Sequence, residues 1–289
     1  MKPVALISKF DPWRSAFCTC PSKLTFNPYT GCDHMCVYCY AAGYVQAFFN
    51  CRPKKDLVSR LQKDVAKLKG EIISIANSSD PYPTLETRLC LTRKCLEILS
   101  QQNCKIQIVT KSDLVVRDID FLKKVPSVVS LTITTDDDDI AKIIEPNVPP
   151  TSKRLKAVAT LLEKRIPVSV RVDPLIPFLN DDVESLMKTL GDVGVKHVTS
   201  STYKIGPQNW KRFSAAVPNV SEKLKTLYFG SGERIGRYIY LPKASRIKLL
   251  ETVGNLAKKY GIKFGTCREG LPHLNTAVCD GSWLLREPC

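Results

Sequence analysis

Short apolar runs rich in Val, Ile and Thr alternate along the chain with longer amphipathic stretches. Runs of this kind are typical of strands buried in a parallel sheet, and apolar residues spaced three or four apart are typical of one helix face. The predicted strands cover residues 23–29, 71–77, 105–111, 128–135, 168–173 and 196–203. The predicted helices cover residues 57–68, 91–98, 114–124, 155–162 and 181–192, the fourth capped by Thr151 or Ser152. This alternation indicates an α/β fold whose parallel sheet is either doubly wound or curled into a partial barrel.

The alternation fades after Tyr203, which suggests three segments. Residues 1–22 precede the first strand, residues 23–205 hold the strands and helices, and residues 206–289 form a basic, aromatic C-terminal extension. Between residues 203 and 263 there are 13 Lys and Arg against 3 Glu and no Asp, so ten of the fifteen net positive charges lie there.

The cysteine count changes the picture more than the overall composition does. The chain has 289 residues, 12 of them Cys, and a formal net charge of +15. No apolar run approaches the ~18 residues that a membrane span needs, and the first residues are too polar for a signal peptide. We therefore expect a cytoplasmic protein with no membrane partner, in which reduced cysteines serve as metal ligands or as small core side chains.

Three cysteines follow the first predicted strand within eight residues. Cys32, Cys36 and Cys39 have the spacing C-x3-C-x2-C. A cubane iron–sulfur cluster takes one thiolate per iron, so three thiolates leave the fourth iron open for a small ligand. Zinc, with His34 or Cys51 as a fourth ligand, is the alternative, although structural zinc sites usually come as two separated pairs.

The residues around these cysteines carry a family resemblance. C-x3-C-x2-C with Tyr38 before the third cysteine resembles the radical S-adenosylmethionine (SAM) superfamily. Six segments between residues 18 and 205 resemble its spore photoproduct lyase-like branch: NPYTGCDHMCVYCYA at 27–41, SSDPYP at 78–83, LTRKCLEIL at 91–99, TKSDLVVRDIDFL at 110–122, TTDDDDIAKIIEP at 134–146 and VRVDPLIPFLND at 170–181. The resemblance implies a partial (β/α)6 TIM-like barrel with the cysteine loop after its first strand.

The same resemblance implies cofactors and an activity. Cys32, Cys36 and Cys39 would ligate a 4Fe-4S cluster whose open iron is chelated by SAM. Reduction by a donor such as ferredoxin or flavodoxin would cleave SAM to methionine and a 5′-deoxyadenosyl radical, with the protein supplying orientation and electrostatics.

Further cofactor contacts are expected where strands end, because functional groups of barrels gather there. By resemblance these are Tyr38 in the cysteine loop and, at or near strand ends, Asn77, Ser79, Asp80, Lys111, Thr134 and Arg171. Helix capping or salt bridges at the barrel rim are the alternative roles for the strand-end residues. The run 136–139 of four Asp predicts a helix N-cap and a solvated turn.

One position departs from the pattern of the lyase branch. The lyase carries a hydrogen-donating cysteine just before the Ser-Asp pair that aligns with Ser79 and Asp80, and this chain has Asn77 there. An amide cannot quench a carbon radical as a thiol does. The sequence therefore favours a relative of the lyase, and not the thymine-dimer repair enzyme itself.

Four other cysteines predict a second metal site. Cys18 and Cys20 precede the first strand, and Cys267 and Cys279 lie near the end of the chain, among glycines and prolines that suit a loop around a metal. If the two ends of the chain meet, these four thiols could hold a second 4Fe-4S cluster. Structural zinc and the absence of any metal are the alternatives.

The basic extension suggests a substrate class. Lys and Arg can hold phosphates, and interleaved Tyr, Trp and Phe can stack on unpaired bases, which favours a nucleic-acid or nucleotide substrate. A solvated basic face with its aromatics in the core is the plainer interpretation. Two other functions remain open: a non-catalytic, metal-stabilised nucleic-acid-binding protein, and radical modification of a protein or small molecule.

Overall fold

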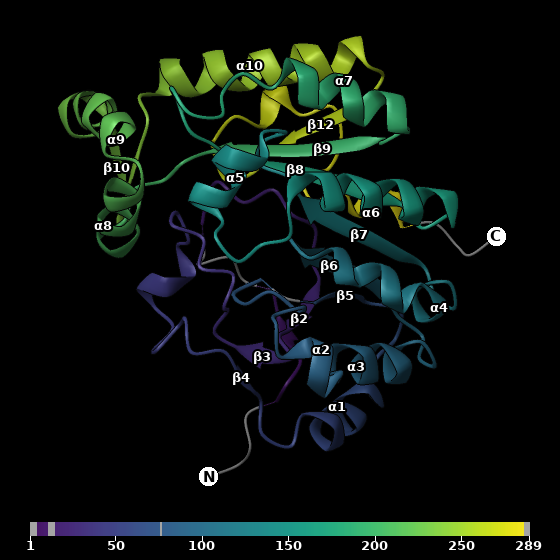
Figure 1. Cartoon of the computed structure of the whole chain (residues 1–289). Helices are drawn as coiled ribbons and strands as arrows, with labels where there is room; N and C mark the ends of the chain where they lie inside the picture. Colours follow the sequence, from purple (N-terminus) through teal and green to yellow (C-terminus); the bar gives the residue numbers. More distant parts are fainter. Residues whose placement is uncertain (1–4, 11–14, 76, 286–289) are drawn as a thin grey trace.

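The computed structural model describes residues 5–10, 15–75 and 77–285, and at its centre is one curved sheet (Figure 1). The strand order is β1-β2-β5-β6-β7-β8-β9-β12. Strand β1 pairs antiparallel with β2, and every other neighbouring pair in this sheet is parallel. The strands are β1 (Ser8–Lys9), β2 (Leu24–Phe26), β5 (Ile72–Ile75), β6 (Lys105–Thr110), β7 (Ser127–Thr132), β8 (Val168–Leu175), β9 (His197–Thr202) and β12 (Lys263–Thr266).

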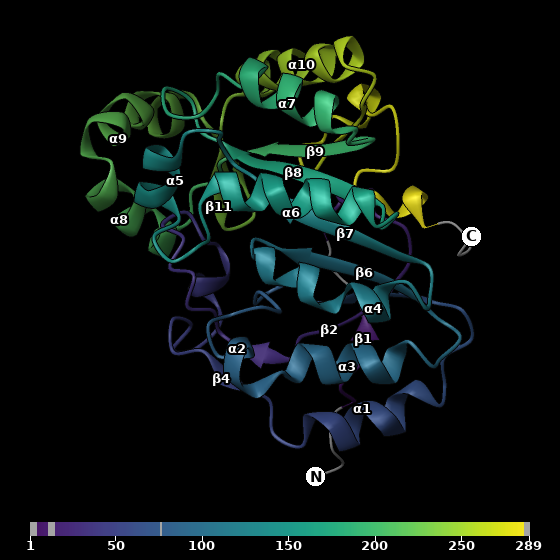
Figure 2. The ribbon, with the colours of Figure 1, turned by 45° about the vertical axis from the view of Figure 1, so that its right-hand side comes forward.

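The helices cover the outer face of the sheet, except the two over residues 207–225, which lie to one side of it (Figure 2). They are α1 (Leu57–Val65), α2 (Glu86–Leu89), α3 (Leu91–Leu99), α4 (Ile119–Leu122), α5 (Asp138–Ile144), α6 (Thr151–Glu163), α7 (Glu184–Val193), α8 (Pro207–Ala216), α9 (Pro218–Lys225) and α10 (Lys243–Lys259). Two small antiparallel pairs lie apart from the main sheet: β3 (Tyr29–Thr30) with β4 (Arg52–Pro53), which flank the cysteine loop, and the hairpin of β10 (Glu233–Ile235) and β11 (Tyr238–Tyr240). The sheet is an open partial barrel and does not close on itself.

All six predicted strands are present, and the sequence reading missed a seventh parallel strand. Strand β12 pairs with β9 after the crossover through α10. The last part of the chain therefore contributes to the barrel sheet, although its hydrophobic periodicity is interrupted by basic residues. The segment boundaries at residues 22 and 205 stay a prediction. None of the described helices is long and apolar enough to cross a membrane.

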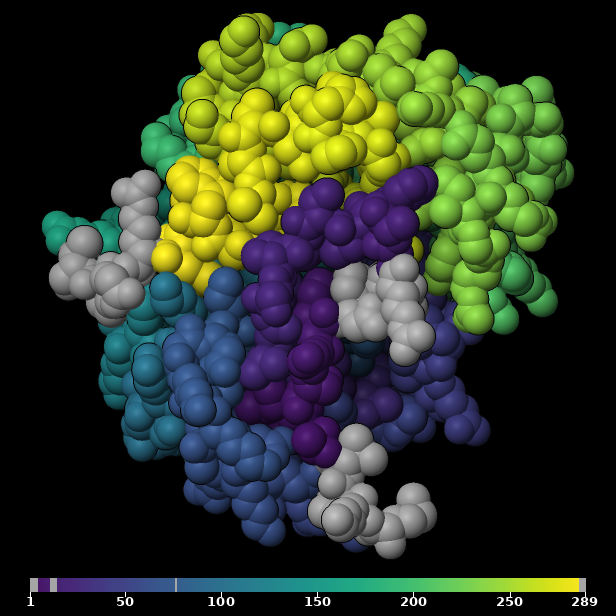
Figure 3. All heavy atoms as spheres, turned by 180° about the vertical axis from the view of Figure 1, so that it is seen from behind, coloured from purple at the N-terminus to yellow at the C-terminus, as the bar shows by residue number. Residues whose placement is uncertain are grey.

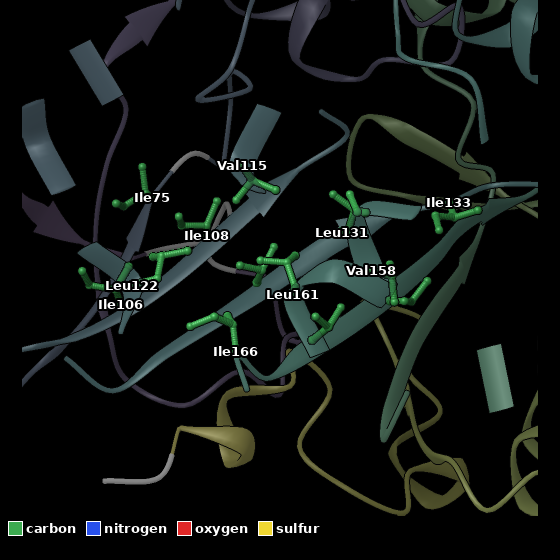
Figure 4. Close-up of a cluster of buried hydrophobic side chains, with 14 of the residues drawn as sticks. Ile75, Ile106, Ile108, Val115, Leu122, Leu131, Ile133, Val158, Leu161 and Ile166 are labelled. Atoms are coloured by element: carbon green, nitrogen blue, oxygen red, sulfur yellow. The ribbon is translucent and has the colours of Figure 1, made fainter. Parts of the chain in front are cut away.

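The hydrophobic core fills the space between sheet and helices (Figure 4). Ile106, Ile108 and Leu131 on the strands are fully buried against side chains such as Val158 and Leu161 of α6. Each such burial contributes roughly 1.5–3 kcal/mol. Because side chains alternate across a strand, the residues between these apolar positions point to the inner side of the curved sheet, where the polar chemistry gathers.

The first residues of α5 and α6 test the two predicted helix N-caps. Asp137 caps α5 as predicted, since its carboxylate accepts the backbone N–H groups of Asp139 at 2.8 Å and Ile140 at 3.0 Å. The predicted cap of α6 was wrong, because Thr151 is the first helical residue and Pro150 occupies the cap position. The Thr151 N–H donates instead to the Asp138 carboxylate at 2.5 Å, so a neighbouring segment satisfies this helix end.

A segment near the start of the chain meets a segment near its end across the opening of the barrel. The edge strands β1 and β12 lie on opposite borders of the sheet. Lys23, just before β2, donates to the carboxylate of Asp280 at 2.6 Å, and both side chains are buried. Seen from behind, the purple N-terminal residues lie against the yellow C-terminal ones (Figure 3).

Candidate functional site

The inner side of the curved sheet encloses a cavity of about 540 Å³, hereafter the central cavity. It lies where strands β5 to β9 end and where the cysteine loop folds back over them. The cavity is lined by nearly all the residues predicted for cofactor and metal binding: Cys18, Cys20, Cys32, Cys36, Tyr38, Cys39, Asn77, Ser79, Asp80, Lys111, Arg171 and Cys267. The structure therefore brings these residues, from segments far apart in the chain, to one cavity, and their roles as cofactor contacts and metal ligands stay a prediction.

Cys279, one of the predicted metal ligands, does not line the central cavity. Thr134 is the predicted cofactor contact that does not line it. Its side chain is fully buried, and its carbonyl accepts the Asn180 amide at 2.7 Å. The cavity residues on this strand are Ser130 and Thr132, because β7 ends at Thr132, two residues earlier than the position chosen from sequence.

The cysteine loop is shaped by a close backbone contact. Gly31 has φ +77°, and a Cβ there would lie 2.2 Å from the carbonyl oxygen of Phe48, so only glycine fits. The next residue, Cys32, donates its N–H to that same carbonyl at 2.8 Å. Cys32 and Cys36 are both buried, and Cys39 is half-buried.

The three thiols fit a cluster better than a single ion. The ligands of one tetrahedral zinc ion lie about 3.8 Å from one another, given a metal–sulfur distance of roughly 2.3 Å. Among the described residues, Cys32, Cys36 and Cys39 do not form a group within 4.8 Å, which suits thiolates bound to separate irons. Burial raises the pKa of all three thiols, so a bound metal is what would hold them as thiolates.

A tighter group of ligand atoms, from Cys32, Asp33 and His34, does lie within 4.8 Å. Its members already have other partners. The Asp33 carboxylate accepts the backbone N–H of Thr84 at 3.0 Å, and the His34 ring lies 3.6 Å from the Asp80 carboxylate. These contacts favour a role in holding the cysteine loop against the strand ends.

A buried network supports the cysteine loop from behind. The Tyr38 hydroxyl donates to the carboxylate of Glu145 at the end of α5. That carboxylate lies 2.7 Å from the guanidinium of Arg154, and both side chains are at most 1% exposed. Arg154 in turn donates to the carbonyl of Thr132 at 3.0 Å, which ties the loop to the end of β7.

Asp80 joins the ends of two neighbouring strands. Its carboxylate accepts the Thr110 hydroxyl at 2.7 Å and the Lys111 N–H at 2.8 Å. Asn77 also has a hydrogen-bond partner, because its amide donates to the Thr25 hydroxyl at 2.5 Å. These two predicted contacts therefore also have structural partners of their own.

Lys111 places a cation at the wall of the central cavity. Its ammonium lies 5.6 Å from the centre of the Tyr38 ring, and no described carboxylate forms an ion pair with it. Burial acts to lower the pKa of Lys111, but the nearby acidic groups Cys36 and Glu145 outweigh it and raise that pKa overall. The side chain is thus a charged group available to an anionic ligand.

Arg171 and Lys204 are two further cations that line the central cavity, each paired with a carboxylate. Arg171 lies 2.5 Å from the Asp173 carboxylate and also contacts the Cys267 thiol. Lys204 pairs with the fully buried Glu269 at 2.6 Å. The sequence reading missed Asp173, Lys204 and Glu269, because nothing in their local pattern distinguishes a cavity charge from a surface one.

Aromatic residues that sequence reasoning also missed lie at the mouth of the cavity. Tyr40 and Tyr44, one helical turn apart after the last cysteine, have ring centres 6.2 Å apart in a stacked arrangement. Both are more than a third exposed. Beside them, a second hollow of about 310 Å³ is lined by Tyr40, Arg237 and Tyr238. The i, i+4 spacing of the two tyrosines is the signal that could have found them.

Much of the aromatic content of the basic stretch is core. Phe213, Tyr228 and Tyr240 are at most 1% exposed, whereas Phe229 is 53% exposed and lies 5.4 Å from the Trp210 ring centre to centre. These buried rings are therefore core side chains, as the interpretation of the extension as a solvated basic face expects. Tyr40, Tyr44 and Phe229 are among the described rings that are exposed.

The fold and the site together define a partial α/β barrel with a three-cysteine loop at the carboxyl ends of its strands. The sequence model described as "Radical SAM superfamily" matches residues 26–214. The chain belongs to this superfamily and is a radical SAM enzyme, and the family uses a 4Fe-4S cluster and SAM. The buried thiols fit these cofactors, and so does Lys111, which forms no ion pair with a described carboxylate.

Similar sequences occur in archaea, bacteria and a virus. The uncharacterized protein MJ0683 of Methanocaldococcus jannaschii is 36% identical over 166 residues, which are 55% of this chain and 63% of that protein. The uncharacterized protein Rv2578c of Mycobacterium tuberculosis is 25% identical over 89% of this chain and 80% of its own length. The uncharacterized protein ORF301 of Acidianus two-tailed virus is 30% identical over 62% of this chain and 71% of its own.

Solved structures of low sequence identity share the fold. Spore photoproduct lyase complexed with dinucleoside spore photoproduct matches with a TM-score of 0.68 and 15% identity, over 92% of this chain and 80% of the lyase. Native anSMEcpe with bound AdoMet and the Kp18Cys peptide matches with a TM-score of 0.51 and 13% identity, over 83% of this chain and 62% of its own. These likenesses concern the fold alone.

Proposed function

We propose that the central cavity binds SAM beside Cys32, Cys36 and Cys39 and that the chain cleaves it reductively. When bound, the reduced cluster supplies the electron that converts SAM to methionine and a 5′-deoxyadenosyl radical, from a potential that in such clusters reaches down to about −700 mV. The observation that carries this proposal is the convergence of the three thiols and the Lys111 cation on one cavity.

The polar groups of the cavity suit the two charges of the methionine moiety. The Lys111 ammonium, which has no ion-pair partner among the described residues, would hold the carboxylate of SAM through a charge-assisted hydrogen bond. Asp80 already accepts three hydrogen bonds, from the Thr110 hydroxyl and from the N–H groups of Lys111 and Tyr82, so of its roughly four lone-pair sites about one is left to accept the amino group. Arg171 is already bound to Asp173 and would orient a ligand only through its remaining N–H groups.

We further propose a nucleotide or nucleic-acid substrate that enters at the mouth of the cavity. The stacked rings of Tyr40 and Tyr44 offer an exposed platform for a base. Arg237 lines the adjoining hollow and can pair with a phosphate. Spore photoproduct lyase, which shares the fold, was solved with a dinucleoside lesion, and this lends support to the same substrate class.

Repair of that lesion by the route of the lyase is not part of this proposal. Asn77 stands at the position of the hydrogen-donating cysteine, and its amide is hydrogen-bonded to Thr25. An amide in this position offers no weak S–H bond to a carbon radical. A radical modification with a different final step is therefore the better fit.

The proposed reductant is a ferredoxin or flavodoxin, and the proposed compartment is the cytoplasm. Both follow from the chemistry, because an open, strongly reducing cluster and twelve thiols require a reducing environment. Transfer of electrons from a purified ferredoxin in place of dithionite would test the first of these two points.

The central test is anaerobic reconstitution followed by addition of dithionite and SAM. We expect about four irons at this site and release of 5′-deoxyadenosine measured by chromatography. Cys36→Ser should abolish the release, whereas Cys51→Ser, which changes a half-buried cysteine outside the motif, should retain it. Zinc without cleavage would instead identify a metal-stabilised binding protein.

The substrate class needs its own measurement. Fluorescence anisotropy with a single-stranded oligonucleotide should show binding that weakens steeply with salt. Arg237→Gln should weaken it several-fold, while Lys258→Gln, an equal charge change at the exposed end of α10, should not. Equal effects of both changes would indicate general attraction to the basic surface, and the absence of binding would favour a protein or small-molecule substrate.

A further inference from the structure

Four cysteines outside the cluster loop come together from the two ends of the chain. Cys18 and Cys20 precede β2, whereas Cys267 follows β12 and Cys279 lies in the C-terminal segment. The sulfur atoms of Cys20 and Cys279 are 3.6 Å apart, although the two residues are 259 positions apart in the sequence. Cys18 contacts the Cys20 thiol in turn.

The surrounding backbone is built to bring Cys279 into this position. A Cβ on Gly265 would lie 2.5 Å from the Cα of Cys279, so this close passage of two segments requires glycine. The carbonyl of Cys279 accepts the Thr199 hydroxyl at 2.6 Å. The following residue, Asp280, is fixed by Lys23 and by Gln107, whose amide donates to the Asp280 carbonyl at 2.7 Å.

The fourth thiol is held by the neighbouring strand. The N–H of Cys267 donates to the carbonyl of Ser200 at 2.8 Å, which continues the pairing of β12 with β9 past its end. Its side chain lines the central cavity together with Cys18 and Cys20. The guanidinium of Arg171 contacts this thiol and offers positive charge beside it.

A structural disulfide explains this arrangement poorly. A disulfide needs a sulfur–sulfur distance of about 2.05 Å, and one bond would use only two of the four cysteines. Four thiols that converge from a C-x-C pair and two distant loops are instead typical of a metal site. The cations Arg171 and Lys23 would partly offset the negative charge of four thiolates.

We propose that Cys18, Cys20, Cys267 and Cys279 hold a second metal centre that fastens the N-terminal segment to the far edge of the sheet. The expected occupant is an iron–sulfur cluster. Among the described residues, Cys18, Cys20 and Cys279 do not form a group within 4.8 Å, as thiolates on one tetrahedral ion would. The 3.6 Å between the sulfurs of Cys20 and Cys279 is itself the spacing of two ligands on one ion, so these two thiols would separate on binding two irons. The centre is independent of the substrate and of SAM cleavage.

The test removes the first site and measures what metal remains. In a Cys32→Ser/Cys36→Ser/Cys39→Ser variant, reconstituted anaerobically, we expect about four irons and four sulfides per chain. Adding Cys20→Ser and Cys279→Ser should remove them, whereas adding Cys90→Ser, a half-buried cysteine distant in the sequence from all seven, should not. Iron is counted by plasma mass spectrometry and the cluster by its electron paramagnetic resonance spectrum.

Each result decides the proposal. One zinc per chain that depends on Cys20 and Cys279 would support the metal centre and reject the iron–sulfur occupant. A folded variant with neither iron nor zinc, or a mass 2 Da lower that reports a disulfide, would overturn the proposal. If the triple variant fails to fold, Cys279→Ser alone should lower the iron count from about eight to about four while the SAM-dependent spectral change at the first cluster persists.

Discussion

Glu145 gives the sharpest test of how the cysteine loop is held. Its carboxylate accepts the Tyr38 hydroxyl on one side and lies 2.7 Å from Arg154 on the other. Nearby positive charge lowers the pKa of Glu145 despite its burial, so the group is ionised at neutral pH. The change Glu145→Gln keeps the shape and the acceptor for Tyr38, but leaves the Arg154 charge buried without a counter-charge.

The expected cost follows from that burial. Removing one partner of a buried ion pair typically costs about 3–5 kcal/mol, because the other charge stays desolvated. Arg154 keeps its hydrogen bond to the Thr132 carbonyl, which places the expected loss near the lower end, at about 3 kcal/mol. The matched control is Glu222→Gln, whose partner Lys225 lies 2.6 Å away on the surface and for which a loss of about 0–1 kcal/mol is expected.

The assay is urea unfolding at pH 7 followed by circular dichroism, for both variants and the parent chain. Iron content after reconstitution is the second readout. A neutral amide accepts the Tyr38 hydroxyl less strongly than a carboxylate does, and this weaker hold on the cysteine loop should lower the iron content in Glu145→Gln and not in Glu222→Gln. Equal stabilities of the two variants would refute the reasoning, since they would show that the buried charge is solvated or paired elsewhere. Adding Arg154→Met to Glu145→Gln should recover part of the loss, as the uncompensated charge is then gone.

Three further changes test other parts of the molecule. Lys111→Met should weaken SAM binding by about 10- to 100-fold, measured calorimetrically, because one charge-assisted contact contributes about 1.5–3 kcal/mol; unchanged affinity would remove Lys111 from the site. Burial lowers the pKa of His197 to about 4 from its ordinary 6.5. This depressed pKa contributes about 3 kcal/mol of stability above pH 6.5 that is lost as the pH falls toward 4, and His197→Phe should show a flatter pH dependence in urea unfolding. Gly265→Ala should displace Cys279 and lower the metal content of the second centre, and retention of the full content would show that the two segments can separate.

The strands and the cysteine loop could be predicted because their signals are local. Runs of β-branched residues mark the sheet, and the spacing of Cys32, Cys36 and Cys39 is short enough to be seen in one segment. Lys111 could be placed as well, since it follows its strand directly. The prediction of Thr134 as a cofactor contact assumed a strand two residues longer than β7, which ends at Thr132. Strand ends predicted from sequence are uncertain by one or two residues, and this difference leaves Thr134 outside the cavity.

Other parts of the site depend on contacts that no local pattern encodes. Strand β12 is short and follows a helix crowded with Lys, so its pairing with β9 is decided by the parallel crossover and not by composition. The Glu145–Arg154 ion pair could not be predicted either, since the sequence around each residue indicates only an exposed charge. Only the packing of α5 against α6 brings the two together beneath Tyr38.

The fold alone does not identify the substrate, because the cofactor-binding residues and the residues at the cavity mouth lie on different parts of the chain. The residues that suit the common cofactor lie on the cysteine loop and at strand ends, where the barrel itself fixes them. The residues that would meet a substrate lie elsewhere: Tyr40 and Tyr44 follow the loop, and Arg237 lies on the β10–β11 hairpin. Such loops and hairpins can change without disturbing the sheet, and 15% identity to spore photoproduct lyase is enough to keep the barrel. Exchanges at these three positions should therefore alter which substrate is bound while SAM affinity stays unchanged, and a parallel loss of SAM affinity would show that mouth and cofactor site are one unit.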